Sequence, residues 1–214
     1  MTCSIAPENA SDPTPENALW SDGWLLSAQH LPSPNFGPRP ADQAIDLIVV
    51  HSISLPPGNY GTGCVQQLFT NQLDWDAHPY FQTIRGLEVS AHFFIERNGV
   101  VWQFVSCDAR AWHAGQSQWL GRDNCNNYSI GIELEGLEGL QFEAVQYRAL
   151  SALCHDLAQR YAITHIAGHE HIAPGRKQDP GPGFDWAQLH TALSDLPVQL
   201  AAQGEASSCK KNSK

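Results

Sequence analysis

The chain lacks a long hydrophobic run, an excess of positive charge and a secretory signal. In its 214 residues no apolar stretch approaches the ~20 residues that cross a bilayer, so we expect no membrane span. The formal net charge of −10 repels phosphate backbones, which argues against nucleic acid as a partner. The N-terminal segment contains neither a basic stretch nor a continuous apolar stretch, so the sequence predicts a cytoplasmic protein.

Paired cysteines and several catalytic motifs are also absent. No Cys-x-x-Cys pair occurs, and in a reducing compartment we expect free thiols at Cys3, Cys64, Cys107, Cys125, Cys154 and Cys209. No G-x-S-x-G motif occurs, which argues against a serine hydrolase. The segment that begins at His169 is not an H-E-x-x-H zinc helix, because Ala173 stands where the second histidine is needed and the following proline and glycine forbid the helix.

What is present suffices for one domain of ordinary size. Residues 20–200 are predicted to form it, between flexible polar segments at 1–19 and 201–214. Apolar residues at steps of three and four predict a helix over residues 142–161. Short apolar runs predict strands at residues 46–51, 128–135 and 164–169.

An antiparallel hairpin is predicted over residues 92–105. Asn98 and Gly99 lie between two strand-like runs and supply the two positive φ angles of a type I′ turn. Strands that alternate with helices and include one hairpin indicate an α/β fold, a single domain with a central mixed β-sheet flanked by helices.

Three side chains have the character of metal ligands. His51 and His169 each end a predicted strand, and in open sheets such ends border the ligand crevice. Asp179 lies in a loop, residues 172–186, that is too rich in proline and glycine for regular structure and can fold back. Two imidazoles and a carboxylate supply three ligands of a catalytic zinc ion and leave a fourth position for water. His171 is an alternative to Asp179, because two histidines two apart on a strand share a face.

Hydrolysis at such a centre also needs a base and a partner for the oxyanion. Glu133 points away from the apolar side of its predicted strand and suits the role of base, although a solvated strand glutamate has the same pattern. Lys177 lies two residues before Asp179 and can stabilise an oxyanion, although loop lysines are usually only solvated.

Several short segments, found in the same order, carry a resemblance to a known family. They are VVHSISLPPG (residues 49–58), AHPYF (77–81), VSAHFFI (89–95), RAWHAG (110–115), SIGIELEG (129–136), GHEHIAPGRKQDPGP (168–182) and FDW (184–186). Over about residues 23–189 the chain resembles the cytoplasmic anhydro-muropeptide amidases of the amidase_2 and peptidoglycan-recognition-protein superfamily. The resemblance implies a mixed sheet with flanking helices and one zinc ion in an open groove.

The resemblance also implies a role for each matching residue. The zinc ligands would be His51, His169 and Asp179, which decides against His171. Glu133 would be the catalytic acid and base, and Lys177 would stabilise the transition state. The substrate groove would include Ser52, Trp112 and His113.

The implied reaction is hydrolysis of the amide between the lactyl group of (1,6-anhydro)N-acetylmuramic acid and L-alanine in muropeptides, during cell-wall recycling. The alternatives are a lytic amidase that acts on polymeric peptidoglycan and a peptidoglycan-binding module without activity. Ser52 replaces an asparagine of the relatives, and Glu88 and Asn124 replace arginines of some, so substrate preference is the property most exposed to change. No oligomer is predicted.

Overall fold

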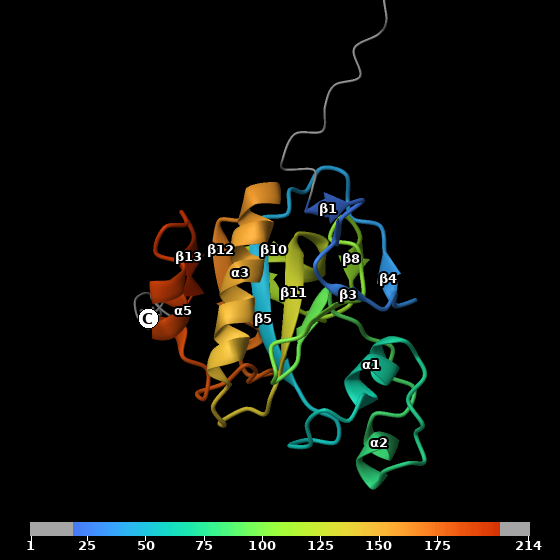
Figure 1. Cartoon of the computed structure of the whole chain (residues 1–214). Coiled ribbons are helices and arrows are strands. Elements are labelled where there is room, and N and C mark those ends of the chain that lie inside the picture. The colour runs from blue at the N-terminus through green and yellow to red at the C-terminus, as the bar shows by residue number, and fades with distance from the viewer. Residues whose placement is uncertain (1–18, 202–214) are drawn as a thin grey trace, which may run out of the picture.

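A seven-stranded mixed sheet forms the centre of the molecule (Figure 1). The structure is a computed structural model that describes residues 19–201, so the predicted flexible segments at the two ends lie almost entirely outside the described residues. The strands in spatial order are β13 (Gln199–Leu200), β12 (His165–Gly168), β5 (Leu47–Ile53), β11 (Ser129–Glu135), β6 (Phe93–Ile95), β7 (Val101–Gln103) and β3 (Gln29–His30). All neighbours are parallel except β6 and β7. The predicted mixed sheet is confirmed.

Five helices, of which only α3 is long, and three pairs of two-residue strands complete the described fold. The helices are α1 (Cys64–Phe69), α2 (Pro79–Thr83), α3 (Ala144–Arg160), α4 (His169–Ile172) and α5 (Trp186–Ala192), with a 3₁₀ turn at Cys125–Asn127. The strand pairs are β1 (Trp20–Ser21) with β2 (Trp24–Leu25), β4 (Phe36–Gly37) with β8 (Arg110–Ala111), and β9 (Gln118–Trp119) with β10 (Arg122–Asp123). Within the described residues no helix is long and apolar enough to cross a membrane.

One face of the sheet packs against α3 and α5, as Figure 1 shows. The predicted helix over residues 142–161 is confirmed as α3, and it begins with a capping box between Glu143 and Gln146. Its apolar side meets alternate residues of the central strands, because successive strand residues point to opposite faces. The buried residues of this layer include Ile48, Val50, Ile130, Ile132, Leu134, Leu150, Leu153 and Leu157.

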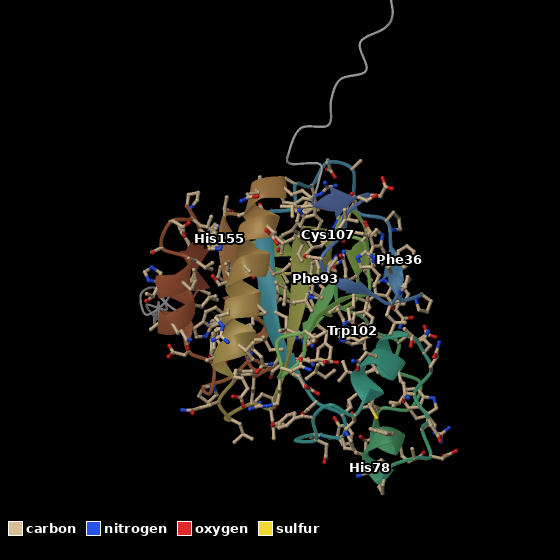
Figure 2. The ribbon with its side chains drawn as sticks, in the orientation of Figure 1. Phe36, His78, Phe93, Trp102, Cys107 and His155 are labelled. Carbon is tan, nitrogen blue, oxygen red and sulfur yellow. The ribbon has the colours of Figure 1, made fainter. Side chains whose placement is uncertain are left out.

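The other face of the sheet is covered mostly by irregular chain. Leu47 and Val49 of β5 pack there against Tyr128, Trp119 and Ile172. A separate apolar cluster joins α1 and α2 to the hairpin strands, and Trp102 of β7 packs at its edge (Figure 2). The helices α1 and α2 therefore form a lobe at one side, well away from α3 (Figure 1).

Two local predictions are corrected. The hairpin exists, but its turn is not type I′: Gly99 has φ +86°, whereas Asn98 has no positive φ. The N–H of Gly99 donates to the carbonyl of Glu96, and the Asn98 side chain accepts the N–H of Val100. These bonds stabilise a wider turn that needs only one left-handed residue. Neither metal-binding histidine ends a strand, because β5 continues past His51 to Ile53, whereas β12 stops at Gly168 and His169 begins the one-turn helix α4. The sequence analysis excluded a helix here because of Pro174 and Gly175, but the four residues His169–Ile172 are enough for one helical turn.

Candidate metal centre

Two neighbouring parallel strands bring His51 and His169 together. Val50 of β5 pairs with Gly168 of β12, and each histidine is the next residue along the chain. Although 118 residues separate them in sequence, their Nδ1 atoms lie 2.9 Å apart. Both are buried, with relative exposures of 1% and 3%.

Asp179 reaches the two histidines because its loop folds back. The N–H of Glu170, in α4, donates to the backbone carbonyl of Asp179 at 2.9 Å. This bond places the carboxylate so that Oδ2 lies 3.1 Å from the Nδ1 atoms of both His51 and His169. The three residues are a buried group whose side-chain atoms converge closely enough to hold a metal ion.

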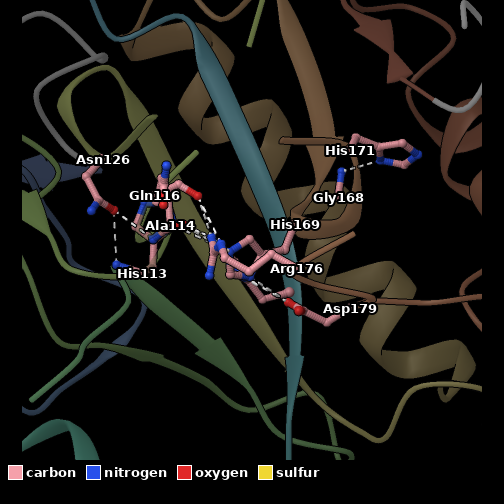
Figure 3. Close-up of polar contacts among 10 residues, drawn as sticks. His113, Ala114, Gln116, Asn126, Gly168, His169, His171, Arg176 and Asp179 are labelled. Carbon is pink, nitrogen blue, oxygen red and sulfur yellow. Dashed lines mark hydrogen bonds and ion pairs between the residues drawn. The ribbon is translucent and has the colours of Figure 1, made fainter. Parts of the chain in front are cut away.

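The outer ring nitrogens show how the converging atoms are protonated. His169 Nε2 lies 3.1 Å from the backbone carbonyl of Ala114, which can only accept a hydrogen bond (Figure 3). The ring proton of His169 therefore sits on Nε2, and Nδ1 presents a lone pair toward the carboxylate of Asp179. Electron-pair donors that face one another at such distances repel unless a cation lies among them. Two imidazole nitrogens and a carboxylate oxygen are the donor set of a catalytic zinc ion, so these residues fit zinc.

Burial and neighbouring side chains push the pKa values of the site carboxylates in opposite directions. Burial alone would raise the pKa of Asp179, but its close contacts with the side chains of His169 and His51 hold it well below its usual range. Burial raises the pKa of Glu133 well above its usual value, and the nearby charge of Asp179 raises it further, while Lys177 opposes both. Burial, with the neighbouring His169, lowers the pKa of His51 to about 4. Asp179 thus stays ionised as a ligand should, whereas Glu133 is able to take up a proton.

Glu133 lies on the neighbouring strand at the level of the metal-binding residues. It pairs with His51 in the register of β11 and β5 and shares its face of the sheet. Its Oε2 is buried and makes no hydrogen bond to any described residue. Glu135, two residues further on, accepts the N–H groups of Gly61 and Arg97 at 2.5 Å and 3.0 Å. Of these two carboxylates, Glu133 is the one left available for a ligand.

A cavity of about 310 Å³ opens over this group. Glu133, Asp179 and His169 line it, together with Lys177, which is solvent-exposed. Its apolar wall includes Leu55, Tyr80, Ile84, Leu87 and Trp112. The arrangement combines a candidate metal, a protonatable carboxylate and a cation beside an aromatic surface.

The structure places the remaining predicted substrate residues unequally. Trp112 is half-buried on the cavity wall. Ser52 also lines the cavity, and its buried Oγ has no hydrogen-bond partner among the described residues. His113 touches the cavity but is only 8% exposed, and its Nδ1 lies 2.9 Å from Nε2 of His51.

His171, the alternative third ligand, turns away from the centre. Its Nδ1 accepts the N–H of Gly168 at 2.9 Å, and its ring packs edge-to-face on Trp186. Figure 3 shows its side chain directed away from His169 and Asp179. The alternative assumed a strand, on which the two histidines would share a face; on the helical turn of α4 they do not.

Sequence reasoning missed the groups that support the ligands from behind. They are the carbonyl of Ala114 and the side chains of Asn126, Ser129 and Arg176, most of which Figure 3 draws. A backbone carbonyl leaves no trace in a sequence. Gly131 did offer a sequence signal, because a glycine inside a strand indicates that another group packs closely against the backbone. A Cβ at this position would come within 2.4 Å of the His113 ring.

Comparison with known proteins agrees with this geometry. The family model of N-acetylmuramoyl-L-alanine amidases, Amidase_2, matches residues 41–182. The chain is 48% identical over 178 residues to the 1,6-anhydro-N-acetylmuramyl-L-alanine amidase AmpD of Citrobacter freundii, covering 82% of this chain and 95% of that protein.

Solved structures give the same result. A selenomethionine derivative of AmpD superposes with a TM-score of 0.79 at 49% identity, covering 81% of this chain and 98% of that chain. The amidase AmiD from Escherichia coli, solved with anhydro-N-acetylmuramic acid-L-Ala-D-gamma-Glu-L-Lys, superposes with a TM-score of 0.51 at 33% identity, covering 69% of this chain and 57% of that chain.

Proposed function

The chain belongs to the Amidase_2 family of N-acetylmuramoyl-L-alanine amidases, and from this premise we propose that it cleaves the amide between the lactyl group of 1,6-anhydro-N-acetylmuramic acid and L-alanine. It is an amide hydrolase of the AmpD type. The ligands of one catalytic zinc ion would be His51, His169 and Asp179. The observation that carries the proposal is the convergence of their three ligand atoms beneath a cavity that Glu133 also lines.

A zinc ion held there would polarise the scissile carbonyl and acidify the attacking water. Glu133 accepts the proton of that water as the new C–O bond forms. Its Oε2 has no hydrogen-bond partner among the described residues, and its raised pKa makes the carboxylate a stronger base. The same carboxyl group then gives the proton to the amine of L-alanine as the C–N bond breaks. Glu135, the other buried carboxylate of the same strand, is not available as a base, because both of its oxygens accept backbone N–H groups.

Lys177 contributes charge at the mouth of the cavity. Its ammonium group is exposed, lines the cavity and influences both Glu133 and His51 electrostatically. We assign it to stabilising the oxyanion that develops on the oxygen of the scissile carbonyl. Trp112 and Ser52 would contact the substrate, Trp112 through its indole face against the sugar or the peptide. The family resemblance also placed His113 in the substrate groove. Because His113 is buried behind His51, we expect it to act on that ligand and not on the substrate.

The substrate class follows from the relatives. AmpD is named for 1,6-anhydro-N-acetylmuramyl-L-alanine, and AmiD was solved with an anhydro-muropeptide. We therefore propose a soluble anhydro-muropeptide as the substrate, and a cytoplasmic role in recycling cell-wall fragments.

The test is a comparison of substrates with the zinc-loaded protein. Anhydro-muropeptide, its non-anhydro counterpart and whole sacculi are incubated in parallel, and released L-Ala-peptide is measured by mass spectrometry. We expect fast release from the anhydro-muropeptide and little from sacculi, with loss of activity after exhaustive chelation and recovery with one equivalent of zinc. Faster release from sacculi would indicate a lytic amidase, and binding without release would indicate a recognition module.

A further inference from the structure

One dipeptide, His113–Ala114, contacts the outer nitrogens of both histidine ligands. The Nδ1 atom of His113 lies 2.9 Å from Nε2 of His51, and the carbonyl of Ala114 lies 3.1 Å from Nε2 of His169. These contacts matter because a neutral imidazole carries a single proton, and a ring that holds it on Nδ1 cannot use Nδ1 as a ligand.

A chain of hydrogen bonds fixes the direction of the contact with His51. It ends at the carbonyl of Cys125, which can only accept, 2.6 Å from the hydroxyl of Ser129. The single hydroxyl proton of Ser129 is used there, so at 3.2 Å His113 must donate from Nε2 to Ser129 Oγ. The Nδ1 of His113 is then bare and accepts the Nε2 proton of His51. This order leaves Nδ1 of His51 free toward Asp179.

The dipeptide itself is held from two sides. Asn126 Oδ1 accepts the N–H groups of His113 and Ala114 at 3.1 Å and 2.8 Å. The guanidinium of Arg176 donates to the carbonyl of Ala114 at 2.7 Å and also to that of Gln116 (Figure 3). Gly131 gives the ring of His113 room against the sheet. Asn126 and Gly131 act on the ligands through the dipeptide, and Arg176 in addition lies 3.4 Å from Nε2 of His169.

We propose that the His113–Ala114 segment sets the tautomer of both histidine ligands, so that His113 is a positioning residue for zinc. The inference rests on the proposed zinc site. Without the segment, a proton on Nδ1 of either histidine would be stabilised by the carboxylate of Asp179, 3.1 Å away, and would occupy the ligand atom. The segment removes this competitor by offering acceptors only on the outer side of each ring. Outer-sphere partners of this kind are typically worth about 10–100-fold in metal affinity.

Two substitutions of His113 separate the acceptor from the ring. His113→Phe keeps an aromatic ring but has no acceptor, whereas His113→Asn places an amide oxygen near the position of Nδ1. We expect zinc affinity, measured by competition with a chelating dye, to fall about 10–100-fold in His113→Phe and to recover most of that loss in His113→Asn. The Nδ1 and Nε2 shifts of His51 in ¹⁵N NMR spectra of the metal-free protein should show an Nε2 proton in wild type and an Nδ1 proton in His113→Phe.

A pair of serine variants supplies the control. Ser129→Ala breaks the relay behind His113. Ser33→Ala deletes another buried hydroxyl, which donates to the backbone carbonyl of Phe69 and not to a partner of the metal-binding residues. Zinc affinity should fall in Ser129→Ala and remain at the wild-type value in Ser33→Ala. Unchanged zinc affinity in both His113→Phe and Ser129→Ala, or an Nε2 proton on His51 in His113→Phe, would overturn the inference. Failure of the wild-type protein to bind zinc would instead overturn the proposed function, and the NMR comparison would still decide the tautomer.

Discussion

The two faces of the central sheet are made by alternate residues of the same strands, yet polar side chains gather mainly on one of them. Beneath α3, Ile130 and Ile132 of β11 join a large apolar cluster. On the other face, Ser129 and Glu133 of the same strand, with His51 of β5, form a buried polar layer. An apolar contact has no direction and depends on area and fit, whereas a buried polar group is tolerated only when its partners are oriented correctly.

This difference teaches where stability and chemistry are located. The face beneath α3 supplies much of the burial that holds the fold together and presents no titratable group to the cavity. The opposite face carries the ligands, the carboxylate of Glu133 and the relay behind His51, all of which cost desolvation. Changes on one face should therefore alter the free energy of unfolding, and changes on the other should alter metal binding and turnover.

The largest effect should come from Asp179→Ala on the polar face. It removes a charged ligand that contacts both histidines, so zinc affinity should fall by more than the roughly 100-fold expected for an outer-sphere residue, and activity should be lost. His171→Ala is the matched control, because His171 turns toward Trp186. Zinc content by elemental analysis decides the point; normal zinc in Asp179→Ala with loss in His171→Ala would make His171 the ligand.

The next effect concerns two carboxylates of one strand. Glu133→Gln removes the proton acceptor and should lower kcat by about 10²–10⁴, with zinc affinity and muropeptide binding retained. Glu135→Gln weakens hydrogen bonds to Gly61 and Arg97 and should lower the free energy of unfolding by about 1–3 kcal/mol, with kcat changed little. Single-turnover kinetics and denaturant unfolding measure the two quantities. An equal loss of kcat in both variants would contradict the assignment of the base to Glu133.

A substitution in the apolar layer beneath α3 tests whether stability and metal binding depend on different faces of the sheet. Leu150 is fully buried in the apolar layer, so Leu150→Ala should cost about 2–5 kcal/mol of unfolding free energy. At temperatures where the variant stays folded, zinc affinity should match that of wild type. A tenfold loss of zinc affinity in the folded variant would show that the two faces are coupled.

Sequence reasoning reached the fold, and the residues that converge at the candidate metal centre, more readily than the groups that support those residues from behind. Alternation in residues 128–135 placed Ile130 and Glu133 on opposite faces, and the register of β11 agrees. Periodicity could not show that the strand carrying His51 and the strand before His169 are neighbours, because pairing across such a distance leaves no local signal. The family resemblance implied only that the two histidines share a metal site. The role of Ala114 was beyond sequence reasoning, since any residue offers the same carbonyl.

Acid should lower the free energy of unfolding of the metal-free protein, because histidines with lowered pKa values are buried on the polar face of the sheet. The folded pKa of His51 is lowered to about 4, and burial also lowers the pKa values of His92 and His113 below their ordinary value. The unfolded chain therefore takes up protons near pH 6.5, before the folded protein does, and stability present above that pH is lost as pH falls toward 4. Because one pKa unit corresponds to about 1.4 kcal/mol, we expect a loss of a few kcal/mol.

The melting temperature of the metal-free protein between pH 4 and pH 7.5 measures this loss. His155 on α3 provides a contrast, since hydrogen bonds to the Ser151 carbonyl and to Asp195 raise its pKa. Its contribution is complete below pH 6.5 and disappears as pH rises through the folded pKa, so His155→Asn should steepen the gain in melting temperature between acid and neutral pH. A melting temperature that rises on acidification would contradict the predicted sign.

The smallest effects should come from one glycine on each face. At Gly131 a Cβ would lie 2.4 Å from the ring of His113, so Gly131→Ala must displace that ring, at about 1–3 kcal/mol of unfolding free energy. At Gly99 the backbone has φ +86° and a Cβ would meet Val145 of α3 at 2.5 Å, so Gly99→Ala should cost about 1–2 kcal/mol or slightly more. Gly86→Ala, with a similar φ of +79° and open space around it, measures the backbone contribution alone. Although the two losses of stability are similar, only Gly131→Ala should weaken zinc binding, because His113 lies behind His51 and Val145 contacts no ligand. Equal zinc affinity in Gly131→Ala and Gly99→Ala would mean that the ring of His113 can move without consequence for the metal, and would leave the two faces different in composition but not in function.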